Sequence, residues 1–83
     1  MRAEQLLPDH LNQVNLNGTT VRKGTVGAFL ANARVWTDRD ADSTARSGAE
    51  ADMRDALPAL RALGVFDVFE IRDAQLRAWI DAH

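Results

Sequence analysis

The chain has 83 residues, of which 46% are hydrophobic and 27% charged, and its net charge is −2. This length makes one domain over residues 1–83, and the composition is typical of a folded globular protein and too apolar for intrinsic disorder. The absence of Cys excludes disulfides, thiolate metal sites and Cys nucleophiles, and the slightly acidic charge balance leaves no broad basic face for nucleic acid.

The first clear element is a β-hairpin in LNQVNLNGTTVRK. Before it, residues 1–10 are either irregular or include a short helical turn that Leu6 and Leu7 end before Pro8. Asn17-Gly18 suits a two-residue type I′ turn, which needs positive φ at both positions. That turn predicts the pairs Leu16 with Thr19, Asn15 with Thr20, Val14 with Val21 and Gln13 with Arg22. Because side chains alternate along a strand, one face is apolar (Val14, Leu16, Thr19, Val21) and the other polar (Gln13, Asn15, Thr20, Arg22).

A helix is predicted after the hairpin, with Thr25 as its N-cap and its end near Thr37. Its apolar positions follow helical spacing: Val26, Phe29, Leu30, Ala33 and Trp36. The following stretch TDRDADSTARSG has no apolar periodicity and is predicted to be a polar connection, in which Asp38 or Asp42 could cap the next helix.

A second helix carries the core positions Met53, Ala56, Leu57, Leu60 and Leu63. Ser47 and Glu50 have capping-box spacing, but the helix could also start at Ser43. Pro58 lies inside the pattern and predicts a kink or break, since it removes a backbone donor. Gly64 is a natural stop for this helix.

The C-terminal third predicts a strand and a last helix. VFDVFEI, residues 65–71, has the β-branched and aromatic content of a strand, and Asp73 caps a helix with Leu76, Trp79 and Ile80 on one face. The fold class is therefore α+β, in the order β-β-α-α-β-α. The predicted strand is apolar on both faces, so it needs cover on both sides. This predicts an interface that includes Val65, Phe66, Val68, Phe69 and Trp79.

The best candidate for a small-ligand site is Arg22-Lys23-Gly24-Thr25, where two cations and a Gly precede a helix N-terminus that favours an anion. The alternative is that both cations only keep the end of the hairpin solvated. The Asp38-x-Asp40-x-Asp42 spacing matches the start of a calcium loop, but the Gly and Glu that such a loop needs later are missing. Asp67 shares a face with apolar neighbours, so it is expected at an edge, paired to an Arg, or functional.

Other groups offer little chemistry. The histidines, His10 and His83, lie near the chain ends, where precise positioning for acid-base work is difficult. Trp36 and Trp79 fit apolar helix faces and are expected in the core, although Trp also lines interfaces. We expect no catalytic residues, no cofactor and no metal site.

The segments TVRKGTVGAFLANARVW and LPALRALGVFDVFEIRDAQLR resemble a family of short uncharacterised bacterial proteins of unknown function. The resemblance spans most of the chain from Val21 onward. It implies no activity and no site residues.

These observations favour a small, non-catalytic module for protein interaction, including self-association as a homo-dimer. The alternatives are a nucleic-acid-binding regulator that uses Gln13, Asn15, Thr20 and Arg22 of the hairpin, and an accessory subunit of an enzyme. Nucleic acid is the weaker partner because of the charge balance. The N-terminus lacks the apolar run of a signal peptide and no segment reaches ~20 apolar residues, so we expect a cytoplasmic protein without a membrane span.

Overall fold

The computed structural model describes residues 1–83, which form one hairpin and five helices. The hairpin consists of β1 (Gln13–Leu16) and β2 (Thr19–Arg22), and the main helices are α2 (Thr25–Thr37), α3 (Ser43–Leu63) and α5 (Ala74–Ala82). Two single helical turns, α1 (Ala3–Leu6) and α4 (Val65–Val68), complete the chain. The small α+β class is confirmed, but the predicted third strand is absent and the order is α-β-β-α-α-α-α.

The hairpin forms as its turn residues predict. Asn17 and Gly18 both have positive φ, at 51° and 87°, as a type I′ turn requires. The register pairs Gln13 with Arg22, Val14 with Val21, Asn15 with Thr20 and Leu16 with Thr19. Val21 is buried on the apolar face, whereas all four residues of the polar face are exposed.

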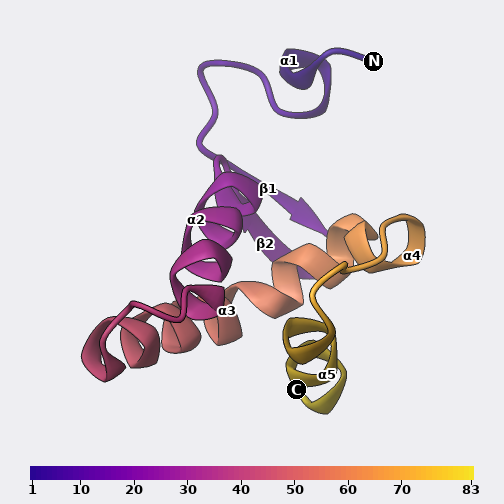
Figure 1. Ribbon diagram of the computed structural model, residues 1–83. Coiled ribbons are helices and arrows are strands. Elements are labelled where there is room, and N and C mark those ends of the chain that lie inside the picture. The colour runs from indigo at the N-terminus through magenta and orange to yellow at the C-terminus, as the bar shows by residue number, and fades with distance from the viewer.

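The core lies between α2, α3 and α5, and the hairpin packs against α3 beside it (Figure 1). Its buried residues are Phe29 and Ala33 of α2, Met53, Leu57 and Leu60 of α3, and Leu76 and Ile80 of α5. The Arg61 guanidinium ties α3 to α5, because it donates hydrogen bonds to the Ile80 and His83 carbonyl oxygens at 3.1 and 3.2 Å.

One prediction about α2 is wrong, the identity of its N-cap. Gly24, with φ 85°, is the N-cap, and Thr25 is the first helical residue, whose hydroxyl donates back to the Arg22 carbonyl at 2.7 Å. Val26 and Leu30 are 51% and 58% exposed, because α2 packs on α3 through the narrower face of Phe29, Ala33 and Trp36.

Helix α3 starts at Ser43, the earlier of the two predicted starts. Its cap is Asp42, whose carboxylate accepts a hydrogen bond from the Ala45 N–H at 2.7 Å. The helix continues through Pro58, so the break that was one of the two outcomes predicted there does not occur. It ends at Gly64, whose φ is 81°. Asp73 caps α5 as predicted, accepting from the Leu76 N–H at 2.9 Å.

The predicted strand at Val65–Ile71 is instead one helical turn followed by an extended loop. The Asp67 N–H donates to the Gly64 carbonyl at 3.1 Å, and the Phe69 N–H to the Val65 carbonyl at 2.8 Å. A strand here would need a neighbouring strand to pair with, and the sheet has only β1 and β2. The helical turn satisfies these backbone groups locally.

The first ten residues stand apart from the rest of the chain (Figure 1). Leu7 has an extended backbone before Pro8, which ends the short α1 as the sequence predicts. None of the helices has the length and apolar character needed to cross a membrane.

Candidate functional site: two apolar surfaces

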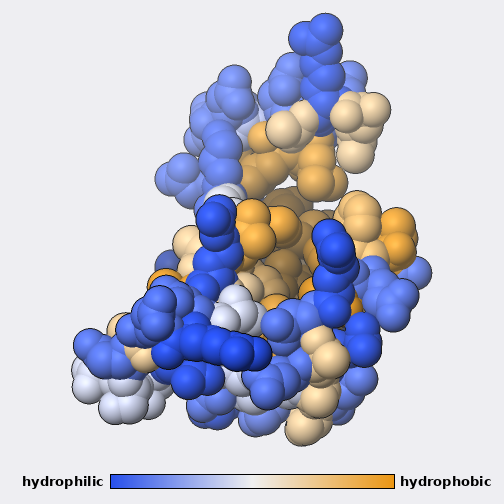
Figure 2. Space-filling model, viewed as in Figure 1, coloured by the Kyte–Doolittle hydropathy of each residue, from blue (hydrophilic) through white to orange (hydrophobic).

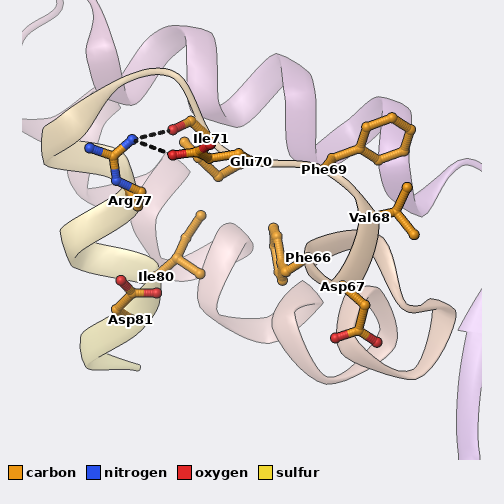
Figure 3. Close-up of a pocket in the computed structure, with 9 residues that line it drawn as sticks. All are labelled: Phe66, Asp67, Val68, Phe69, Glu70, Ile71, Arg77, Ile80 and Asp81. Atoms are coloured by element: carbon orange, nitrogen blue, oxygen red, sulfur yellow. Dashed lines mark hydrogen bonds and ion pairs between the residues drawn. The ribbon is translucent and has the colours of Figure 1, made fainter.

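The segment after α3 divides its apolar side chains between the core and the solvent. Val65, Phe66 and Ile71 pack against the core, where the Phe66 ring meets Phe29 edge to face at 6.4 Å. Val68 and Phe69 are 79% and 68% exposed, and they project away from Arg77 and Ile80 (Figure 3). We call Val68 and Phe69 the apolar knob.

Acidic side chains line the pocket next to the knob. This shallow pocket of about 310 Å³ is lined by five apolar residues, two of which are Val68 and Phe69, and by Asp67, Glu70, Asp81 and Arg77. Arg77 donates to the Ile71 carbonyl at 2.8 Å and lies 3.5 Å from Glu70, as the dashed lines in Figure 3 show. Asp67 is exposed and makes no ion pair. Three carboxylates against one guanidinium leave this surface negative.

The predicted anion site is the connection between β2 and α2. Lys23 is already engaged, because its Nζ donates to the Asp9 carbonyl at 3.1 Å and lies 3.8 Å from the Asp9 carboxylate. Arg22 is exposed and forms no ion pair. Arg22 is therefore the cation of this connection that is free to meet an anion, and anion binding here stays a prediction.

Beside this connection lies a second apolar surface, which the sequence did not reveal. A groove of about 320 Å³ separates the N-terminal segment from the body of the protein. Figure 2 shows hydrophobic side chains gathered around the hollow beneath the N-terminal segment. Its apolar lining comes from four parts of the chain and includes Leu6, Leu7, Val14, Val21, Val26 and Leu63, with Arg22 and Lys23 also lining it.

The groove brings together residues that are too distant in the sequence to be grouped from it. The available signal was the group of three leucines, Leu6, Leu7 and Leu11, that precedes the hairpin in the sequence. Leu6 and Leu11 are 48% and 42% exposed. Leu6 lines the groove together with Ala3, Leu7 and Asp9, so residues 1–10 supply one of its walls.

The polar face of the hairpin also lines a wide groove of about 840 Å³. Gln13, Thr20 and Arg22 lie on one side of it, and Asp52 and Asp55 of α3 line it as well. Arg22 lines this groove as well as the one beneath the N-terminal segment, and on this side the two carboxylates oppose the approach of a phosphate backbone to it.

The remaining candidate residues have structural partners. The Trp36 indole N–H donates to Glu50 at 3.3 Å, and the Trp36 and Trp79 rings lie 6.1 Å apart. His83 stacks on Trp79 with ring centroids 4.5 Å apart. Asp38 accepts from the Asp40 N–H, and the structure groups no three His, Cys, Asp or Glu side chains as metal ligands.

The model of a family described as "Domain of unknown function (DUF7709)" matches residues 3–82. The chain belongs to this family. The match confirms the resemblance to a family of unknown function, and it extends it through the hairpin and most of the N-terminal segment, so both walls of the groove are part of the DUF7709 domain. Comparisons with curated proteins and with solved structures gave no match.

Proposed function

We propose that this DUF7709 domain is a non-catalytic interaction module whose first partner is a second copy of itself. The observation that carries the proposal is the amount of surface that the single chain leaves exposed. Its accessible surface is 6162 Å². A compact monomer of 9.2 kDa is expected to expose about 4,900 Å².

The excess is about 1,200 Å², which is larger than the roughly 800 Å² that each partner buries in a standard protein interface. The radius of gyration is likewise 13.7 Å, against about 12 Å expected for 83 residues. Part of the excess comes from the N-terminal segment, which stands off the body (Figure 1). Association that covers this segment would bring the exposed area to the value of a compact protein.

The exposed residues are also of the type that interfaces bury. Leu6, Val26, Leu30, Val68 and Phe69 are all between 48% and 79% exposed. An apolar surface of this extent on a small domain is typical of a partner site. Val68 and Phe69 are members of the predicted interface, whereas Val65, Phe66 and Trp79 are partly buried against the core.

The two alternatives have less support. A nucleic-acid regulator that reads bases with the hairpin would have to bring Arg22 to DNA past Asp52 and Asp55. An accessory subunit of an enzyme would use the same apolar surfaces with a different partner, so it is an outcome of the same experiment.

The test is the mass of the purified protein by size-exclusion chromatography with light scattering, from low to high micromolar concentration. We expect the mass to rise above 9.2 kDa with concentration. A strict monomer at high micromolar concentration would refute self-association, and a pull-down from the native cell would then look for a different partner.

A further inference from the structure

We infer that the apolar knob of one copy docks in the groove beneath the N-terminal segment of a second copy, with Asp67 facing Arg22. This inference rests on the proposed self-association and specifies its surfaces. The ligand of the groove is thus the segment Asp67-Val68-Phe69-Glu70, in which two apolar side chains stand between two carboxylates.

The shapes and polarities of the two surfaces match. The knob presents Val68 and Phe69, the two most exposed large apolar side chains after Met1, which point away from Arg77 and Ile80 (Figure 3). The groove is concave, has about 320 Å³ of open volume, and is apolar on both walls, with Leu6 on one and Val26 on the other. A buried aromatic anchor in an apolar pocket is the usual centre of a stable interface.

The charges of the two surfaces are complementary. Asp67, Glu70 and Asp81 line the pocket next to the knob with Arg77 as their one cation, so this surface is negative. The groove is lined by Arg22, Lys23 and Asp9, and because Lys23 is paired with Asp9, Arg22 is its uncompensated charge. Arg22 and Asp67 are both exposed and both lack an ion-pair partner within the chain. Docking the knob would therefore give the predicted anion site at Arg22–Thr25 a carboxylate from the second copy.

Like-to-like contacts are less favourable. Two knob surfaces facing each other would bring six carboxylates together with two guanidinium groups, since each copy contributes Asp67, Glu70, Asp81 and Arg77. Like charges that face each other across an interface oppose association. Two grooves facing each other would leave both concave surfaces unfilled. Contact between knob and groove avoids both problems, and it closes a symmetric dimer where it forms twice about a two-fold axis.

The decisive experiment uses two variants that each destroy one half of the contact. Phe69→Asp removes the knob, and Val26→Glu places a charge in the groove. Both side chains are more than half exposed, so neither change disturbs the core. Each variant alone should associate about tenfold or more weakly than the wild type, as expected for a central interface residue.

An equimolar mixture of the two variants should associate again. The Val26→Glu chain keeps an intact knob and the Phe69→Asp chain an intact groove, so one complete contact forms between unlike chains. Sedimentation velocity with one fluorescently labelled variant measures this complex. A mixture that remains monomeric overturns the inference, as does a Phe69→Asp protein that associates like the wild type.

Val35→Glu is the matched control. Val35 is an exposed valine of the same helix, nine residues from Val26 and therefore on the opposite side of α2. This variant should associate like the wild type, and a loss equal to that of Val26→Glu would contradict the inference. Arg22→Glu and Asp67→Arg should each weaken association about two- to fivefold, and the two changes in one chain should restore it.

The outcomes separate the two proposals. A wild-type protein that stays monomeric refutes the proposed function itself. A wild-type protein that associates while Phe69→Asp and Val26→Glu have no effect leaves self-association standing and refutes only the assignment of the knob and the groove.

Discussion

Replacing Leu60 with Ala should destabilise this fold far more than replacing Leu30 with Ala, although both leucines lie on predicted apolar helix faces. Leu60 is 1% exposed, in the core between α2, α3 and α5, whereas Leu30 is 58% exposed on α2. The chemical change is the same at both positions. The pair therefore measures burial alone and tests which face of α2 meets the core.

The expected magnitudes differ several-fold. Truncation of a fully buried leucine costs about 2–5 kcal/mol, because the apolar contacts are lost and a cavity remains. A substitution on the exposed side of a helix changes stability by about 0.5 kcal/mol or less. The whole domain is expected to have a stability of roughly 4–12 kcal/mol, so Leu60→Ala removes a large part of it.

Thermal and urea unfolding followed by far-UV circular dichroism provide the assay. At about 4–8 °C per kcal/mol for a domain of this size, a loss of about 3 kcal/mol lowers Tm by roughly 12–24 °C. Leu30→Ala should lower it by about 4 °C or less. Each curve is recorded at two protein concentrations, because self-association adds a concentration-dependent contribution. Equal losses for the two variants would refute the burial of α2 described here.

Two further pairs of variants test local features. Gly48→Ala should stabilise the domain by about 0.5–1 kcal/mol in urea unfolding, because Gly48 lies inside α3 and the space that a Cβ would occupy is open. Gly64→Ala should destabilise the domain by about 1 kcal/mol, because Gly64 has a left-handed backbone with φ 81°. A gain at both glycines would be inconsistent with the left-handed backbone at Gly64. Asp73→Ala should cost about 1 kcal/mol through loss of the cap on the Leu76 N–H, and Asp73→Asn should retain most of the stability because it can still cap. Equal stability of Asp73→Ala and the wild type would show that the cap contributes nothing.

Features set by local chemistry could be predicted from the sequence. The hairpin register follows from Asn17-Gly18, because few residue pairs adopt positive φ at two successive positions. The C-terminus of α3 likewise follows from Gly64, and the N-terminus of α5 follows from Asp73. Both residues act on backbone groups within three or four residues of themselves. These signals need no knowledge of the rest of the fold.

Features that depend on distant partners could not be predicted. Val65–Ile71 has the composition of a strand, but a strand requires a hydrogen-bonded neighbour, and the hairpin does not pair with this segment. Helix α2 has more apolar residues than its one packing face can bury. The sequence therefore could not distinguish Phe29, which lies in the core, from Leu30, which lies outside it. The groove was missed for the same reason, since its walls come from four separate parts of the chain.

Apolar positions that the single chain leaves exposed lie on or next to the surfaces assigned to self-association. Val68 and Phe69 were predicted to need cover because they lay on a strand, and Val26 and Leu30 were among the apolar positions predicted at helical spacing in α2. Within the single chain nothing covers them. Hydrophobic patterns record burial, but they do not record whether the covering residues belong to the same chain. An apolar position that the pattern buries and the fold exposes is therefore evidence for a partner, and in this domain such positions fall on the knob and along the groove side of α2.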